Sequence, residues 1–323
     1  MAVPTNTVQT YSRNSIREDL TDIISDISPT DTPFISNIGT GAARQRLHEW
    51  QNDELAAPNG NNAVVEGDDV DADVADPTVR LNNYVQLMDK AVTVSSTSRA
   101  VDNAGYADEL AYQLTKRSKE LKRDLEVRAC GNYAAAPGAA GAAGEMAGSE
   151  AFIRTNADRG TGGAAGTLSA GTSGFVNAAA TDGTARAFTE DQLKGVHEAA
   201  WTAGGEPDML LMSGALKQKA STFTGLALNR RNQGDGQMTI IGAADLYVGD
   251  FGEISFVPSR FTSNRSAQLL DTSLWKVCEL QPYSMEELAK TGHSEKRLLS
   301  CEKTLQCQNE LGNAIIADLD PAL

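Results

Sequence analysis

The sequence has few residues of the kinds that build reactive or metal-binding centres. Only four cysteines and three histidines occur among 323 residues, and they are scattered along the chain. His48, His197 and His293 lie in three different segments, and Cys301 and Cys307 do not have the spacing of a zinc motif. We therefore predict no metal site and no cofactor, four cysteines that stay reduced, and synthesis in a cytoplasm.

Long apolar runs are also missing. No stretch approaches the roughly 20 apolar residues that a membrane span needs. The N-terminal stretch MAVPTNTVQTYSRN has no apolar core of the kind found in secretion signals. The sequence therefore predicts no association with a membrane.

Positive charge is scarce: 28 Lys and Arg stand against 43 Asp and Glu, which gives a net charge of −15. Nucleic-acid binding as the main task is disfavoured, because such binding depends on neutralising phosphates with Lys and Arg. A strongly negative surface would instead keep many copies soluble and would repel DNA packed nearby.

Catalytic motifs are absent as well. The sequence contains no GxxxxGK[ST] phosphate-binding loop, no GxSxG and no HExxH. The acidic run at residues 66–76 lacks the ligand layout of a calcium-binding loop. A solvated loop is the favoured interpretation of this run, with weak cation binding as the alternative. We predict that the protein is not an enzyme.

The clearest regular element that is present is a helix over residues 104–129, with Asp102 or Asn103 as its cap and Gly131 at its end. One apolar stripe on the helical period predicts a buried face, formed by Leu110, Leu114, Leu121 and Leu125. The opposite face carries Lys116, Lys119, Lys122 and Arg123, with the expected ion pairs Lys116–Glu120 and Asp124–Arg128.

Extended segments precede this helix, and mixed structure follows it. A short amphipathic helix at 18–27 and a turn-rich bend lead to an extended segment at 43–51, whose expected partner is the strand 79–96. The Ala- and Gly-rich residues 134–186 are predicted to be mostly irregular. A helix capped by Thr189 and Gln192 is expected to bury Leu193, Val196, Ala200 and Trp201. Further on, the pattern predicts a buried strand at 208–212, a helix capped by Ser213, and strands at 238–241, 244–248, 254–257, 269–270 and 274–281, with Pro282 ending the last of these.

Residues 17–55, REDLTDIISDISPTDTPFISNIGTGAARQRLHEWQNDEL, resemble the N-terminal segment of a family of tailed-bacteriophage major capsid proteins. In that family an SPTDTPF-type bend precedes an extended HEWQ strand. Supporting matches follow in the expected order, at YADELAYQLTKRSKELKRDLE, AFIRTN and TEDQL…GGEPDMLLMSG.

The resemblance implies an α+β fold of the Hong Kong 97 type. Its parts would be an N-terminal arm (1–42), a long E-loop hairpin (43–97) and a peripheral domain with the spine helix and the Ala/Gly-rich loop (98–187). An α/β axial domain (188–285) and C-terminal strands that return to the peripheral domain (286–323) would complete it. Only about two dozen residues precede the family bend, so we expect assembly to depend on a separate scaffold protein.

The function implied by the resemblance is a major capsid protein. Copies would form hexamers and pentamers of an icosahedral shell in the virion, assembled in the host bacterial cytoplasm around double-stranded DNA that is bound without sequence specificity. The other expected partners are a portal protein, the scaffold and a decoration protein. The alternative is an encapsulin-like nanocompartment that encloses a cargo enzyme. The residues expected at contacts between subunits are Phe34, Arg44, Arg46, Trp50, Tyr84, Lys116, Lys119, Lys122 and Arg123.

Overall fold

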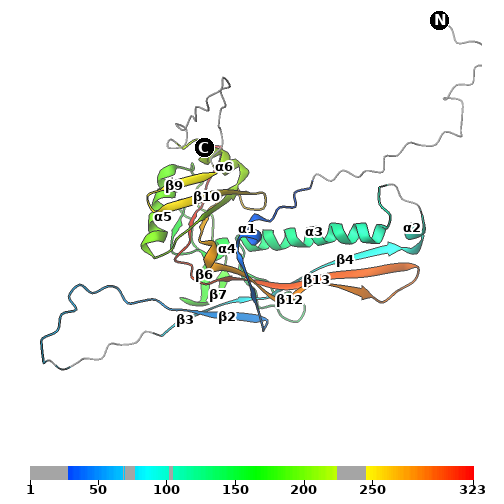
Figure 1. Ribbon diagram of the computed structural model, residues 1–323, viewed down its shortest axis with the longest axis horizontal. Coiled ribbons are helices and arrows are strands. Elements are labelled where there is room, and N and C mark those ends of the chain that lie inside the picture. Colours follow the sequence, from blue (N-terminus) through cyan, green and yellow to red (C-terminus); the bar gives the residue numbers. More distant parts are fainter. Residues whose placement is uncertain (1–27, 68, 70–76, 102–104, 224–244) are drawn as a thin grey trace, which may run out of the picture.

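The computed structural model describes residues 28–67, 69, 77–101, 105–223 and 245–323 (Figure 1). The predicted helix at 18–27, the predicted strand at 238–241 and the predicted caps Asp102 and Asn103 lie outside these residues. Within them the chain forms an elongated part, built on one long helix, and a more rounded part beside it (Figure 1).

The elongated part is a long helix packed on a sheet. The helix is α3 (Glu109–Cys130), and the four strands beneath it are arranged in the order β1-β12-β13-β4. Their bounds are Gly39–Ala42 for β1, Trp275–Leu288 for β12, Ser294–Cys307 for β13 and Gln86–Ser95 for β4, and the short helix α2 (Ser96–Ala100) follows β4.

The predicted leucine stripe of α3 is confirmed. Leu121 and Leu125 are each only 1% exposed and belong to the main hydrophobic core. Leu110 is buried against β4, where Leu114 is only partly covered. The helix starts later than predicted, because Gly105 adopts a positive φ of 89° and the chain turns there. The cap is therefore Asp108, whose Oδ1 accepts the N–H of Leu110 at 3.1 Å.

The ion pairs predicted within α3 are wrong. Glu120 binds Arg117 at 2.6 Å, and Asp124 reaches across to Lys90 of β4 at 2.7 Å. Arg128 donates to the carbonyl oxygen of Met146 at 2.7 Å and pairs with Glu145. Glu120 thus pairs with a different neighbour on the same helix, whereas Asp124 and Arg128 pair with the sheet and with a distant loop, partners that spacing along the helix does not indicate.

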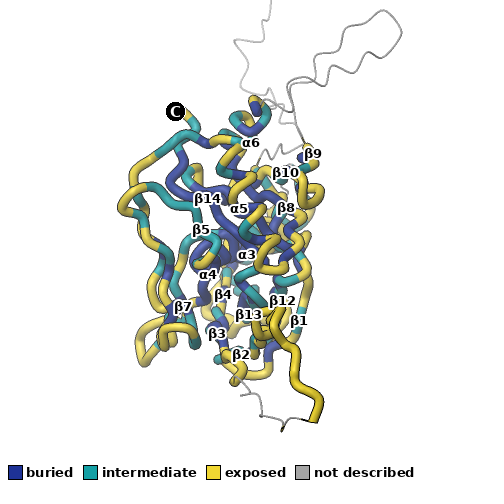
Figure 2. Tube along the Cα trace, turned by 90° about the vertical axis from the view of Figure 1, so that its left-hand side faces the viewer, coloured by how far each residue is buried: buried dark blue, intermediate teal, exposed yellow. Residues whose placement is uncertain are grey.

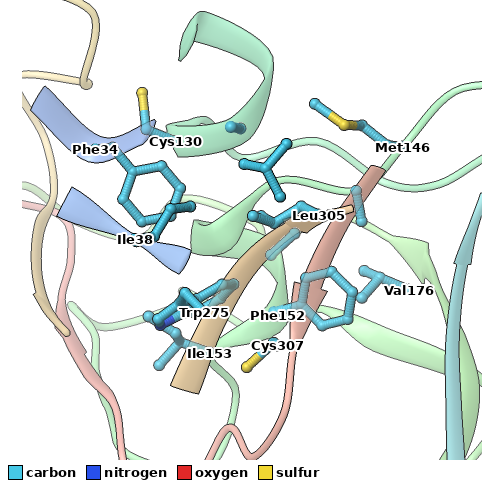
Figure 3. Close-up of a cluster of buried hydrophobic side chains, with 14 of the residues drawn as sticks. Phe34, Ile38, Cys130, Met146, Phe152, Ile153, Val176, Trp275, Leu305 and Cys307 are labelled. Atoms are coloured by element: carbon cyan, nitrogen blue, oxygen red, sulfur yellow. The ribbon is translucent and has the colours of Figure 1, made fainter. Parts of the chain in front are cut away.

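The bend before β1 contains a one-turn helix, α1 (Pro33–Asn37), which is joined to α3 through a buried carboxylate. Glu126 accepts the backbone N–H groups of Phe34 and Ile35 at 2.8 and 2.9 Å. Burial raises the pKa of Glu126, and these two hydrogen bonds oppose that shift. Figure 3 shows the Phe34 ring in the core beside Ile38 and Cys130, with Trp275 below it.

The predicted pairing of segment 43–51 with strand 79–96 is correct only for the first part of that strand. Strand β2 (Leu47–Asn52) pairs antiparallel with β3 (Val79–Tyr84), and this hairpin joins β7 (Ser173–Ala178) and β6 (Thr167–Ala170). After Val85 the chain enters β4, which pairs with β13 instead. The prediction of one continuous strand at 79–96 is wrong, because Met88, Val92 and Val94 turn their side chains into the elongated part of the subunit.

Residues 134–186 are more ordered than predicted. They include α4 (Ser149–Phe152), β5 (Ala157–Asp158), β6 and β7, and they bury Met146, Ile153 and Val176. Small residues permit close packing here: a Cβ on Gly148 would lie 2.1 Å from the carbonyl oxygen of Gly131. The Ala- and Gly-rich composition therefore reflects backbone contact more than an open loop.

The rounded part is a six-stranded sheet with helices packed on it, in the order β5-β14-β11-β8-β10-β9. The fully buried strand at its centre, the capping box at Thr189 and the Ser213 cap are all confirmed. Its elements are α5 (Glu190–Thr202), β8 (Met209–Ser213), α6 (Gly214–Ala220), β9 (Leu246–Gly249), β10 (Gly252–Ser259), β11 (Ala267–Leu270), the 3-10 turn η2 (Thr272–Leu274) and β14 (Ala314–Ile316). Figure 2 shows buried positions along β8 and β14 and in α4, between the two parts.

The prediction that Pro282 ends its strand is wrong. Strand β12 runs through it to Leu288, and the register shifts between Gln281 and Ser284. Proline is tolerated at such an irregularity, and β1 pairs with β12 only as far as Glu279, so no ladder hydrogen bond is lost.

Candidate intersubunit surfaces

Three lysines form an exposed row along α3, which we call the lysine row: Lys116, Lys119 and Lys122. Among the described residues, none of the three ammonium groups lies within 4.0 Å of a carboxylate. A single helix face thus presents three positive charges that the described part of the subunit does not neutralise.

Arg123 does not belong to this row. Its guanidinium lies over the Phe261 ring at 5.7 Å, and its Nε is buried. Arg123 therefore contacts the rounded part of its own subunit, and we do not propose it as an intersubunit contact.

The three aromatic residues expected at subunit contacts point inward. Phe34 is 0% exposed and Trp50 is buried against Phe152, with ring centroids 6.2 Å apart. Tyr84 is half-buried against Phe175 at 5.2 Å. Because their own subunit covers Phe34 and Trp50, these two residues are corrected to core positions.

Arg44 and Arg46 are both exposed at the base of the β2–β3 hairpin. Arg46 donates from Nη2 to the carbonyl oxygen of Gly138 at 3.1 Å, which ties the hairpin base to the turn at 136–145. Arg44 has no recorded ion pair among the described residues and remains available to a neighbour.

The buried side-chain amide of Asn83 holds the hairpin root, by which we mean the end of β3 where the β2–β3 hairpin joins the rest of the subunit. Asn83 is 0% exposed; its Nδ2 donates to the carbonyl oxygen of Leu305 at 2.7 Å, and its Oδ1 accepts the N–H of Ala147 at 2.9 Å. This side chain connects β3 to β13 and to the segment before α4. The direction in which the hairpin leaves the subunit is therefore set by the core.

The described residues of the loop that joins β2 to β3 are exposed to solvent. Leu55 is 99% exposed, and Val64 and Val65 are also exposed. The described acidic residues of this loop, Asp53, Glu54, Glu66 and Asp69, are exposed as well. Exposed aliphatic side chains beside carboxylates are typical of a surface that becomes covered on association.

An exposed apolar patch at the edge of the six-stranded sheet was missed by sequence reasoning. Trp201 was expected to be buried, but it is 53% exposed and stacks on Phe251 with ring centroids 4.9 Å apart. Leu246 and Val248 of β9 are exposed beside it. Trp201 follows Ala200 on α5, one position past the buried face, and only the position of Phe251 shows where its ring lies.

The described residues contain no group of three or more His, Cys, Asp or Glu side chains able to hold a metal ion. All four cysteines are buried, and burial raises the pKa of Cys301 to about 11, which disfavours a reactive thiolate. His48 Nε2 lies 3.2 Å from Gln306 Oε1, and His197 is buried against Phe251. Among the described helices, none is long and apolar enough to cross a bilayer.

The comparisons with known proteins agree with this architecture. The model of the SU10 major capsid protein family matches residues 3–320. A 126-residue segment is 44% identical to the major capsid protein of Escherichia phage Phieco32; it spans 39% of this chain and 36% of that relative.

Solved structures show the same fold at low identity. The Cyanophage A-1(L) capsid asymmetric unit matches with a TM-score of 0.66 at 12% identity, covering 97% of this chain and 99% of the other. The holo-SrpI encapsulin complex from Synechococcus elongatus PCC 7942 matches with a TM-score of 0.57 at 12% identity, covering 100% and 98%. The predicted Hong Kong 97-type α+β fold is thus confirmed, and with the family model matching almost the whole sequence, the chain belongs to the SU10 major capsid protein family.

Proposed function

We propose that many copies of this chain assemble as hexamers and pentamers into an icosahedral shell around double-stranded phage DNA. The observation that supports this proposal is a pair of oppositely charged surfaces that lie apart in one subunit. In Figure 1 the loop that joins β2 to β3 extends away to the left, whereas α3, with its lysine row, runs to the right. Opposite charges separated in this way favour pairing between copies, with the E-loop of one subunit across the spine helix of the next.

Reversing the charge of the lysine row tests this contact. The variant Lys116→Glu/Lys119→Glu/Lys122→Glu is expected to fold normally, because all three side chains are exposed. Its particle yield should fall at least tenfold, since each contact loses an attraction of roughly 1 kcal/mol or less and gains a repulsion. Thermal unfolding measures the first expectation, and sedimentation of particles measures the second.

The matched control is the exposed residue Thr115 on the same helix, replaced as Thr115→Glu. It adds a negative charge without removing a lysine, and should assemble better than the triple variant. Equal particle yields from the triple variant and the wild type would contradict the proposed role of the lysine row.

The remaining partners follow from the capsid role. We propose a portal protein at one vertex, a separate scaffold protein during assembly, and a decoration protein bound at the exposed E-loop. The packaged DNA would be held without sequence specificity, and the net charge of −15 would let it slide along the inner surface. Synthesis and assembly would take place in the host bacterial cytoplasm, and the shell would be part of the virion.

An encapsulin-like nanocompartment is the second candidate, because the encapsulin fold matches along the whole chain. The higher TM-score of the cyanophage capsid and the phage family model favour the capsid. Purified particles distinguish the two functions: nuclease-protected DNA inside supports the capsid, whereas a protein cargo without DNA supports the nanocompartment.

We also expect shells without covalent crosslinks through the E-loop. No lysine precedes Lys90, so residues 52–78 offer no amine for an isopeptide bond to a neighbour. Denaturing electrophoresis of mature particles should give a single band at the mass of the monomer. A ladder of linked subunits would show this expectation to be wrong.

A further inference from the structure

Strand β4 lies at one edge of the sheet beneath α3. It pairs with β13 on one side, and within the described residues no strand pairs with its other side. At ten residues it is long for an unprotected edge. Proteins usually shorten, charge or cover such edges, because the free backbone groups there can pair with another chain.

The register identifies the backbone groups that face the open edge. The N–H of Ser96 donates to the carbonyl oxygen of His293 at 2.9 Å, in line with the pairing of Ser95 with Ser294. Hydrogen-bonded and non-hydrogen-bonded pairs alternate in an antiparallel ladder, so, counting back from Ser96, the backbone groups of Val94 and Val92 hydrogen-bond to β13. The N–H and C=O groups of Ala91, Thr93 and Ser95 therefore point outward.

A groove runs beside this edge. It has a volume of about 310 Å³ and lies between residues 91–95 and the first turns of α3. The helix side of the groove is polar and is formed by Glu109, Gln113 and Arg117. Gln113 donates to Glu109 at 2.8 Å, and hydrogen bonds from Tyr106 and Gln113 lower the pKa of Glu109, so its carboxylate stays ionised. The groove thus suits an extended segment that is polar and not acidic.

We propose that residues 5–13 of a neighbouring copy pair with the open edge of β4 as a further strand. This inference rests on the shell proposed above, because it needs an adjacent copy. The sequence TNTVQTYSR contains no Pro or Gly to interrupt a strand, and its Thr, Val and Tyr favour extended backbone. The pairing is β-augmentation, in which backbone hydrogen bonds supply the affinity and the groove selects the side chains.

Charge supports this occupant. The first 17 residues contain Arg13 and Arg17 and no Asp or Glu, in a chain of net charge −15. Of the charged residues that line the groove, Glu109 is ionised and Arg117 is already paired with Glu120, and the exposed Asp89 lies two residues before the groove on β4. A segment without acidic residues adds no repulsion to Glu109 and Asp89, whereas most other parts of the same chain would bring further negative charge.

Chain length and direction favour a neighbour over the subunit's own arm. Residues 14–27 can span roughly 45 Å when extended, at about 3.3 Å per residue, so distance does not limit the contact. Residues 28–32 leave α1 on the side of α3 that faces away from the sheet (Figure 1). The subunit's own arm would have to pass around α3 to reach β4, but the arm of an adjacent copy would not.

Hydrogen exchange on the full-length chain tests the proposal. Amides 91 and 93, and those of residues 5–13, are expected to exchange at least tenfold more slowly in particles than in unassembled subunits. Deleting residues 5–13 should remove the protection of the β4 edge in particles and leave β13 unchanged. Slow exchange at the β4 edge in unassembled subunits, or protection that persists in particles of the deletion variant, would overturn the proposal.

Thr93→Pro provides a second test, with Thr93→Ala as its control. Proline removes an N–H that makes no bond to β13, so the subunit should still fold. Residues 5–13 should then lose protection in particles, or particles should fail to form, for proline but not for alanine. If residues 5–13 are equally protected from hydrogen exchange in both variants, they do not bind to the edge of β4. Particles that form with an unprotected edge refute only this contact, whereas a wild-type chain that never forms particles refutes the shell itself.

Discussion

Leu121→Asp is expected to prevent the subunit from folding. Leu121 lies on the buried side of α3 at 1% exposure, within the core that contains Phe34, Trp275 and Leu305. Removing a buried leucine costs about 2–5 kcal/mol, and burying a carboxylate without a partner adds several more. Together these costs approach the whole stability of a typical domain, about 5–15 kcal/mol. The measurement is the yield of soluble protein, with circular dichroism of any that remains.

Lys122→Asp, one position further along, is the matched control. Lys122 is exposed, so the change should cost no more than about 0.7 kcal/mol through helix propensity. Leu114→Asp should lie between the two, because Leu114 is only partly buried. Similar unfolding by the Leu121 and Lys122 substitutions would mean that α3 is not divided into a core face and a contact face.

Asn83→Ala is the second substitution with a large expected effect. It removes the acceptor of the Ala147 N–H and the donor to the Leu305 carbonyl oxygen, both deep in the subunit. Each of these two buried groups left without a partner costs about 1–3 kcal/mol, so we expect a total loss of about 2–6 kcal/mol. Chemical denaturation of the unassembled subunit measures this loss.

Asn82→Ala is the natural comparison. The Asn82 amide donates to the exposed Glu49 at 3.3 Å, and its buried Oδ1 accepts no hydrogen bond among the described residues, so its removal leaves no buried group without a partner. Its removal should change stability by no more than about 0.5 kcal/mol. An equal loss in both variants would show that the hairpin root does not depend on the buried amide of Asn83.

The hairpin root explains how a protruding loop can carry an assembly contact. An isolated two-stranded ribbon is marginally stable in water. Here β3 is held through Asn83 to β13 and to the segment before α4, and β2 and β3 join a four-stranded sheet. The core thus fixes where the loop begins, and under the proposed function a neighbouring subunit supplies the surface on which it ends.

The sequence by itself determined the elements with strong local patterns. The leucine period identified α3, Thr189 and Gln192 identified the start of α5, and the apolar run at 209–212 identified the buried strand β8. Such features depend on side chains a few residues apart, so the sequence displays them directly. The resemblance of residues 17–55 added the fold, which periodicity alone could not supply.

Only the tertiary structure decided which surfaces remain free. It buried Phe34 and Trp50, turned Arg123 onto Phe261, and left the lysine row without partners among the described residues. It also divided 79–96 between two sheets and left one edge of β4 unpaired by any strand of the described residues. The physical reason is that exposure and pairing depend on segments separated by tens to hundreds of residues, and no local pattern encodes where those segments meet.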